Sequence, residues 1–174
     1  MYLVSIYFDE KTSKKIQQYI NKVAACTGNT FMLDGSVPPH ITVSAFEMQD
    51  EATAIKSLER AVARLRKGTL EWVSVGQFFP YVIFMIPVLN EYLHEMSAIV
   101  NEELSSMNGI KISPYYRPFQ WLPHATIAKK LSNEQMRVAF EVLQNSFGIF
   151  EGEVVRIGLA KPNPHHDIAT WELK

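Results

Sequence analysis

The sequence predicts a folded protein in which strands and helices alternate and the second half repeats the first. The chain has 174 residues, of which 47% are hydrophobic and 20% are charged, close to the average of globular proteins. Strand-like and helix-like segments follow one another along its whole length. Five of them are followed by five of the same kinds in the same order, about 84 residues further on, which is the separation of His40 from His124. This ordered repeat indicates an internal duplication.

The first half is expected to contain a strand, a helix, a strand, a helix and a strand, in residues 2–8, 12–26, 41–46, 51–67 and 69–75. The strand segments are rich in β-branched and aromatic residues. The first helix carries Ile16 and Ile20 at helical spacing and stops near Gly28. For the second helix, Asp50 is a suitable cap at the start, and we expect it to end at Gly68.

The second half is expected to repeat these elements in residues 81–86, 89–107, 125–128, 132–146 and 153–160, and a further strand at 168–173 closes the chain. The first of its helices carries Leu93 and Met96 on one apolar stripe. Ser132 and Gln135 fit a capping box at the start of the next. Residues 165–167, with the sequence His-His-Asp, are expected to form a polar turn before the last strand, with a metal site as the alternative.

The two halves are expected to pack together as a single domain. Their approximate bounds are residues 1–80 and 81–174, and no stretch rich in Gly, Ser or Pro separates them. Two similar halves that share one core would be related by an approximate two-fold axis. We therefore expect one domain over residues 1–174 and, in the absence of a sequence signal for assembly, a monomer.

Charge and motif content exclude several classes of function. The net charge is −1, so the chain lacks the excess of Lys and Arg with which proteins hold long nucleic acid non-specifically. Its longest apolar run, residues 81–89, is far too short to span a bilayer. A single cysteine, Cys26, and the lack of a signal peptide predict a cytoplasmic protein. No glycine-rich phosphate loop or dinucleotide fingerprint is present, so we expect no cofactor.

The strongest signal is a pair of tetrapeptides separated by the same shift. Pro39-His40-Ile41-Thr42 is matched by Pro123-His124-Ala125-Thr126. Alternate residues of a strand point to one face, so each histidine shares a face with the threonine two residues later, and the residue between them points into the core. A two-fold axis would then bring two imidazoles and two hydroxyls together across one cleft.

This set of groups suits the chemistry of a phosphate ester. One imidazole can take a proton while the other gives one, and the hydroxyls can donate hydrogen bonds to the non-bridging oxygens as charge builds on them. No metal ion is needed for these steps. A bell-shaped pH–rate profile is expected, with both limbs near the ordinary pKa of histidine.

The paired His-x-Thr motifs resemble those of the 2H phosphoesterase superfamily, which includes bacterial 2'-5' RNA ligases and cyclic nucleotide phosphodiesterases. The resemblance implies an α+β, bilobal duplicated fold with two antiparallel sheets flanking a central cleft and helices on the outside. It also implies metal-independent action on 2',3'-cyclic phosphates or 2'-5' linkages of nucleotides or RNA ends. His40, Thr42, His124 and Thr126 match the catalytic positions of the family. Many bacterial members carry an arginine shortly after the second motif, where this sequence has Lys129 and Lys130.

The function that we predict from these motifs is hydrolysis of a 2',3'-cyclic phosphate on a nucleotide or a short RNA end. Two alternatives use the same cleft. One is the joining or cleavage of 2'-5' linked RNA, and the other is a nucleotide-binding module without turnover. A structural role for both histidines and a shared zinc site are weaker interpretations, because His-x-Thr supplies no third protein ligand to zinc.

Five further residues are candidates for substrate binding. Tyr115, Arg117 and Trp121 lie in an aromatic segment before the second motif, which could stack a base and pair with a phosphate or could simply cover the core. On the strand alternation Lys130 shares the face of His124, where it would meet a phosphate or, as is commoner for an edge lysine, solvent. Phe46 shares the face of His40 and could stack a base, although core packing is the commoner role.

Overall fold

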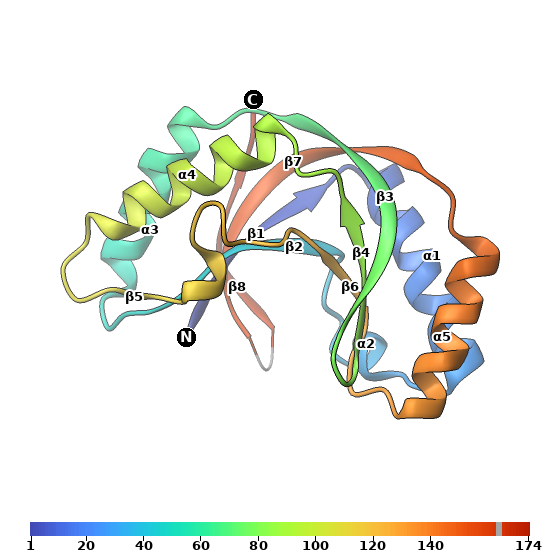
Figure 1. Cartoon of the computed structure of the whole chain (residues 1–174). Helices are drawn as coiled ribbons and strands as arrows, with labels where there is room; N and C mark the ends of the chain where they lie inside the picture. Colours follow the sequence, from blue (N-terminus) through green and yellow to red (C-terminus); the bar gives the residue numbers. More distant parts are fainter. Residues whose placement is uncertain (163–164) are drawn as a thin grey trace.

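The computed structural model describes residues 1–162 and 165–174, in which strands form one curved antiparallel sheet with helices on its outer side (Figure 1). The strands are β1 Tyr2–Phe8, β2 His40–Glu47, β3 Gly68–Phe78, β4 Val82–Pro87, β5 Lys111–Ile112, β6 Ala125–Ala128, β7 Phe150–Lys161 and β8 His166–Glu172. The helices are α1 Glu10–Thr27, α2 Phe31–Asp34, α3 Glu51–Arg64, α4 Glu91–Ser105, α5 Asn133–Ser146 and the 3₁₀ helix η1 Pro114–Tyr116. Residues 163 and 164, within the turn expected between the last two strands, lie outside the described residues.

The order of the strands is nearly the same when it is read from either end of the sheet. The path is β5-β2-β1-β7-β3-β4-β6, with β8 beside β7. The expected counterparts in the two halves are β2 and β6, β1 and β4, and β7 and β3. When each strand is replaced by its counterpart, the order is the same path read in the opposite direction, apart from β5 and β8, which have no counterpart. The helices obey the same exchange, because α1 packs on α5 and α4 packs on α3. This order supports the proposal that residues 1–80 and 81–174 are duplicated halves.

The α+β class, the antiparallel pairing and the bilobal arrangement are confirmed, but the strands of the two halves are joined. β7 pairs with β3 through residues 150–154 and with β8 through residues 156–161, while its other edge pairs with β1. Hydrogen bonds therefore run from one half to the other through the middle of a single sheet. The two sheets expected from the sequence are the two ends of this sheet.

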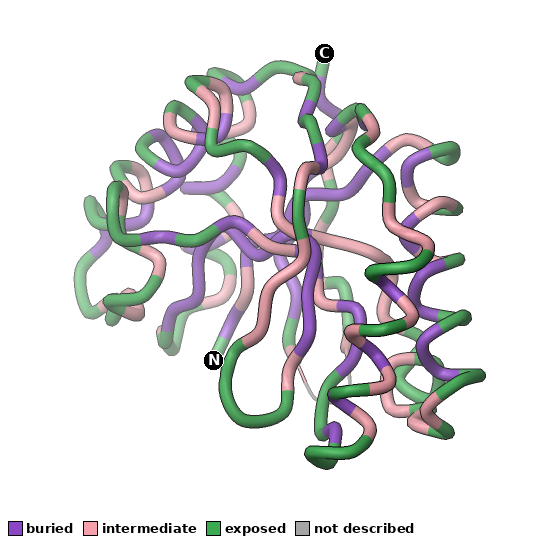
Figure 2. The backbone as a smooth tube through the Cα atoms, turned by 45° about the vertical axis from the view of Figure 1, so that its right-hand side comes forward, coloured by how far each residue is buried: buried purple, intermediate pink, exposed green. Residues whose placement is uncertain are grey.

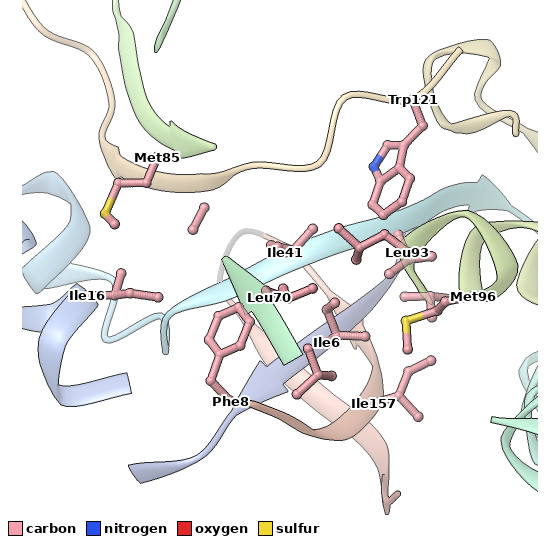
Figure 3. Packing of buried hydrophobic residues seen from close by; sticks show 14 of the residues in the cluster. Ile6, Phe8, Ile16, Ile41, Leu70, Met85, Leu93, Met96, Trp121 and Ile157 are labelled. Carbon is pink, nitrogen blue, oxygen red and sulfur yellow. The ribbon is translucent and has the colours of Figure 1, made fainter. Parts of the chain in front are cut away.

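The core lies between the sheet and the helices that cover it (Figure 3). Alternate residues of β2 and β6 face it, and Ile41, Ala125 and Ile127 are at most 1% exposed, as the motif alternation predicts. Each of the long helices α1, α3, α4 and α5 turns one stripe of buried residues inward, so buried and exposed segments alternate along it (Figure 2). None of the helices of the described residues is long and apolar enough to cross a membrane.

Local signals place most of the helix ends. Asp50 caps α3 by accepting a hydrogen bond from the backbone N–H of Thr53, and Ser132 and Gln135 form the expected capping box of α5. Gly28 ends α1 in the left-handed region, with φ of 70°. The expected end of α3 at Gly68 is wrong: the helix stops at Arg64, and Gly68 begins β3.

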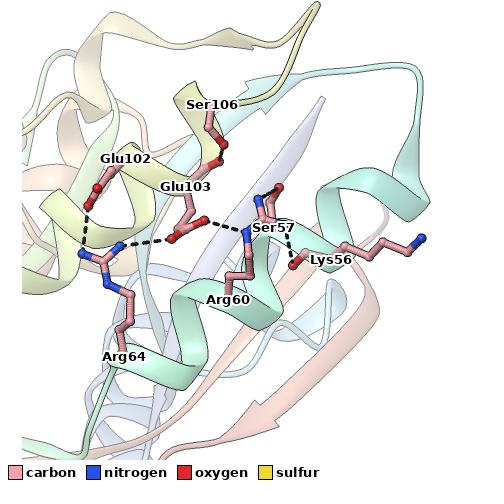
Figure 4. Close-up of polar contacts among 7 residues, drawn as sticks. All are labelled: Lys56, Ser57, Arg60, Arg64, Glu102, Glu103 and Ser106. Carbon is pink, nitrogen blue, oxygen red and sulfur yellow. Dashed lines mark hydrogen bonds and ion pairs between the residues drawn. The ribbon is translucent and has the colours of Figure 1, made fainter.

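Ion pairs hold α3 against α4 on the outer surface (Figure 4). Arg60 Nε lies 2.9 Å from a carboxylate oxygen of Glu103. The guanidinium of Arg64 contacts Glu102 at 2.8 Å and Glu103 at 3.0 Å. The basic end of α3 is therefore paired with acidic side chains of the helix that packs on it.

Candidate active site

The two motifs begin β2 and β6, which lie near opposite ends of the strand order. The sheet curves so strongly that these two strands nevertheless contact each other (Figure 1). Their histidines open onto two adjoining pockets, of about 390 Å³ beside His40 and about 530 Å³ beside His124. Thr126 and Lys129 line both pockets, so the two imidazoles face one continuous region of the surface.

Both imidazoles are held in the same way. Nδ1 of His40 lies 2.8 Å from the carbonyl oxygen of Pro38, and Nδ1 of His124 lies 2.9 Å from that of Leu122. A carbonyl oxygen can only accept a hydrogen bond, so in each ring Nδ1 carries the proton and donates it. Nε2 is then the nitrogen that can exchange a proton with a substrate. The two motifs therefore share the orientation of the ring as well as the sequence.

Burial keeps both imidazoles neutral at physiological pH. It lowers the pKa of His40 to about 4, and the positive charges of His165, Lys129 and His124 act in the same direction. Burial also lowers the pKa of His124, again with a contribution from Lys129. The pKa of Lys129 is itself lowered by burial. A neutral imidazole with a free Nε2 is suited to accept a proton.

The surroundings of the two rings differ. His40 lies beside Tyr7 and His165, with ring centroids 6.3 and 6.2 Å away. His124 instead contacts Phe78, whose ring meets it edge-on at 4.8 Å, and Phe84 at 5.0 Å. One motif histidine therefore has polar neighbours and the other has apolar ones.

The two threonines are not equivalent. Thr126 lines both pockets, whereas Thr42 is 9% exposed and is not among the described residues that line either pocket. Thr42 pairs with Ser5 of β1, and its carbonyl oxygen accepts a hydrogen bond from Nε1 of Trp121 at 3.0 Å. Of the two predicted hydroxyls, that of Thr126 has direct access to a ligand in the cleft.

The segment before the second motif is divided between structure and cleft. Trp121 is 7% exposed, packs in the core and lines the pocket of His124 with one edge. Tyr115 lines the same pocket and is 79% exposed, so its ring is available to a ligand. Arg117 directly follows η1 and is exposed. It is not among the described residues that line these two pockets.

Two candidates for substrate binding are not among the described residues that line the two pockets. Phe46 is 1% exposed and stacks on Tyr2 within the core, because the pairing of β1 with β2 skips Val43 and shifts the alternation beyond it. Lys130 lies beyond the end of β6, with φ of 57°, and its ammonium group sits over the ring of Phe31. The expected stacking role of Phe46 is therefore corrected, because its ring is buried. Lys130 does not share a strand face with His124, and its phosphate role stays a prediction, while Lys129 lines both pockets.

His165 is the residue of the site that the sequence interpretation missed. The sequence predicts His165 in a polar turn, and in the structure it directly precedes β8. Its imidazole nevertheless lines the pocket of His40, and its side chain is only 13% exposed. Nothing in the local pattern ties residue 165 to residue 40. Two signals in the sequence point to this segment. Asp167 lies two residues after His165, and the strand that follows has no counterpart in the duplicated order.

Comparison with protein families decides the relationship. The model of the 2'-5' RNA ligase superfamily matches residues 12–165, a range that includes both His-x-Thr motifs. The chain belongs to the 2'-5' RNA ligase superfamily. The resemblance to the 2H phosphoesterases is thereby confirmed. No curated protein sequence matches the chain significantly.

Solved structures with a similar fold match this superfamily member over nearly their whole length. LigT of E. coli in complex with 3'-AMP shares 16% sequence identity with a TM-score of 0.64, covering 99% of this chain and 97% of LigT. The protein TT0787 of Thermus thermophilus shares 13% identity with a TM-score of 0.65, covering 99% and 97%. A structure described as a phosphoesterase shares 15% identity with a TM-score of 0.61, covering 99% and 98%. At these identities the likeness shows the fold.

Proposed function

We propose that the protein is a phosphoesterase that hydrolyses a 2',3'-cyclic phosphate on a nucleotide or a short RNA end. The observation that carries this proposal is the matched pair of imidazoles, each of which donates from Nδ1 to the carbonyl two residues earlier and presents Nε2 to the cleft. Two proton carriers of this kind provide both halves of an acid–base reaction. Thr126 and Lys129, which lie on both pockets, supply a hydrogen-bond donor and a charge for the phosphate oxygens.

The reaction needs three events. Nε2 of one imidazole takes a proton from water, and the oxygen of that water attacks phosphorus. The bond between phosphorus and one ribose oxygen breaks, and the other ring, which must enter the reaction as an imidazolium, gives its Nε2 proton to that oxygen. The hydroxyl of Thr126 and the ammonium of Lys129 are placed to interact with the non-bridging oxygens as negative charge increases on them. The side chains of both motifs provide these groups without a metal ion.

A short substrate agrees with the charge of the molecule. The net charge is −1, and the basic end of α3 is occupied by Glu102 and Glu103, so affinity must come from the cleft itself. LigT of E. coli, which shares the fold, has been crystallised with 3'-AMP, a nucleoside 3'-monophosphate. A compound of that class is one of the two products that opening of a 2',3'-cyclic nucleotide can give.

The name of the matching family favours one second candidate, which is action on 2'-5' linkages in RNA. The same imidazoles would serve it, since cleavage or joining of such a linkage also moves one proton to and one from a ribose oxygen. A substrate panel separates the two candidates. It contains 2',3'-cyclic nucleotides and 2'-5' linked dinucleotides, incubated with the protein and EDTA.

We expect cyclic nucleotides to be opened in the presence of EDTA, and His40→Ala and His124→Ala each to reduce kcat by about 100-fold or more. His166→Ala is the matched control, because His166 lies on the exposed side of β8. Thr126→Val should reduce kcat, and Thr126→Ser, which keeps the hydroxyl, should restore most of it. Full activity in either motif-histidine variant, or a strict need for a divalent metal, would contradict the proposal.

A further inference from the structure

The strand β8 breaks the symmetry of the sheet beside one of the two motif histidines. β8 pairs with β7 and has no counterpart among the strands described in the first half. In Figure 1 the β7–β8 hairpin projects below the sheet, on the side of β1 and β2. It brings His165 to the pocket of His40. The β3–β4 hairpin approaches His124, but it brings the apolar ring of Phe78 there and no titratable side chain that lines this pocket in the described part of the chain.

His165 is held in place within this pocket. Its ring lies nearly parallel to that of His40, with 26° between the planes and 6.2 Å between the centroids. Its Nε2 lies 3.2 Å from Oδ1 of Asp167, and the side chain is 13% exposed. The contact with Asp167 lacks the geometry of a hydrogen bond, so it is the enclosure of the side chain beside His40 that limits its reorientation and defines its position.

Asp167 is fixed in turn by the strand that neighbours His40. The hydroxyl of Tyr7 donates a hydrogen bond of 2.9 Å to Oδ1 of Asp167, and Tyr7 is paired with His40 across β1 and β2. The guanidinium of Arg156 lies over the ring of Tyr7 at 4.8 Å. Tyr7 itself is 2% exposed. A continuous set of contacts thus leads from β7 and β1 through Asp167 to His165.

We propose that His165 is a positioning residue, held against His40 by Asp167 and Tyr7, that makes two otherwise equivalent histidines take different roles in proton transfer. This inference rests on the proposed function, in which one imidazole must accept a proton while the other donates one. Duplication alone would give two rings with the same tautomer, the same carbonyl partner and the same role. The hairpin adds an imidazole beside His40, whereas Phe78 and Phe84 pack against His124.

The charged groups around His40 give the direction of the effect. His165 faces it from the hairpin, Lys129 from the end of β6 and His124 from β6, and each lowers the pKa of His40 when it is positive. Tyr7 is the remaining titratable group in contact, and burial holds its phenol in the protonated form. A positive His165 therefore disfavours a proton on His40, which assigns His40 as the base and His124 as the acid of the hydrolysis.

The titratable groups around His165 come from several elements. Asp167 on β8 pairs with it, the phenol of Tyr7 on β1 reaches it only through Asp167, and His40 faces it from β2. Asp34 of α2 and Lys129 line the same pocket with opposite charges. Of these groups, Asp167 has its carboxylate nearest to the imidazole nitrogen of His165, at 3.2 Å.

The experiment is an NMR titration of the imidazole resonances, which needs no substrate. In His165→Phe, a ring is kept and the charge is lost. We expect the midpoint of His40 to rise by roughly 0.5–2 pH units, the effect of two unit charges 6.2 Å apart at an effective dielectric constant between about 80 and 20. The midpoint of His124 should not change. His166→Phe is the matched control on the same hairpin, and both midpoints should stay as in the unmodified protein.

A second variant separates charge from packing. His165→Lys keeps a positive charge and loses the ring, so His40 should titrate as in the unmodified protein. The proposal is overturned if His40 is unaffected by His165→Phe, if His124 moves as much as His40, or if the Lys and Phe variants titrate alike. In active protein, the acid limb of kcat/KM should move with the midpoint of His40. A shifted midpoint in a protein that opens no cyclic phosphate would contradict the proposed function and leave the contact itself established.

Discussion

The lowered pKa of His40 determines the pH range in which a two-histidine reaction can run. The ring must be neutral to accept a proton, and its pKa of about 4 means that it is neutral over most of the acid range. The other ring, His124, must be protonated to act as the acid, and burial lowers its pKa below the ordinary value of 6.5. The productive combination is most abundant above the pKa of His40 and below the lowered pKa of His124.

We therefore predict that kcat/KM for a 2',3'-cyclic nucleotide is greatest between about pH 4 and 6.5. Above the pKa of His124 the acid loses its proton, so kcat/KM should fall by about tenfold for each further pH unit. The profile would be measured at constant ionic strength with a buffer series. The sequence alone predicts limbs near the ordinary pKa of histidine, and burial is the reason for the difference. An optimum at pH 7 or above would contradict this prediction.

The motif residues were predictable from the sequence because a strand has a strict alternation. The placement of His40, His124 and Thr126 beside one cleft follows from two assumptions: that a strand starts at each motif and that the two copies face each other. Phe46 failed because one unpaired residue in β2 reverses the alternation beyond it, and no sequence signal marks that bulge. Lys130 failed because β6 ends at Ala128, so the alternation no longer applied.

At the scale of secondary structure, long periodic segments were predicted well, and a short one was predicted only where a motif marked it, as for β6. The five long helices and strands of each half follow hydrophobic patterns of 10 or more residues or β-rich runs with clear ends. In contrast, α2, β5 and η1 contain between two and four residues each, too few for a period to be visible. These short elements lie in the segments that lead to the motifs, so the outer parts of the cleft were the least predictable.

The strand β7 carries a glycine that the ring of Tyr7 requires. A Cβ atom at Gly158 would lie 2.9 Å from Cε2 of Tyr7 and 3.2 Å from Cγ2 of Thr170. We predict that Gly158→Ala lowers the free energy of unfolding by about 1–3 kcal/mol, because the ring and the neighbouring strand must move apart. The measurement is the midpoint of urea denaturation.

Gly148 provides the control for this substitution. A Cβ atom there would meet nothing within 4 Å, so Gly148→Ala should leave stability unchanged or raise it by a few tenths of a kcal/mol. If the two variants unfold at the same urea concentration, the close packing of Tyr7 against β7 is not a constraint on the fold. An equal loss in both would mean that general strand or loop effects account for the change.

At the scale of the whole molecule, the sheet has two consequences for the site. The near-symmetrical strand order brings β2 and β6 into contact, which places both motifs on one surface. The strand β8 adds a residue pair to one motif alone. The repeat was visible in the sequence as an equal spacing of elements, but the contact between the two ends of the sheet depends on its curvature, which no local pattern encodes.

The indole of Trp121 links the segment that leads to the second motif with β2, because its Nε1 donates to the carbonyl of Thr42 at 3.0 Å. Trp121→Phe keeps a ring and removes this donor. We predict a fall in kcat/KM of about tenfold or more, because a displacement of about 1 Å between the two imidazoles is costly to catalysis. Trp72 is the matched control: it is fully buried, and its Nε1 has no partner among the described residues, so Trp72→Phe breaks no such link. If Trp72→Phe reduces kcat/KM as much as Trp121→Phe does at equal stability, the relative placement of the two halves does not depend on this hydrogen bond.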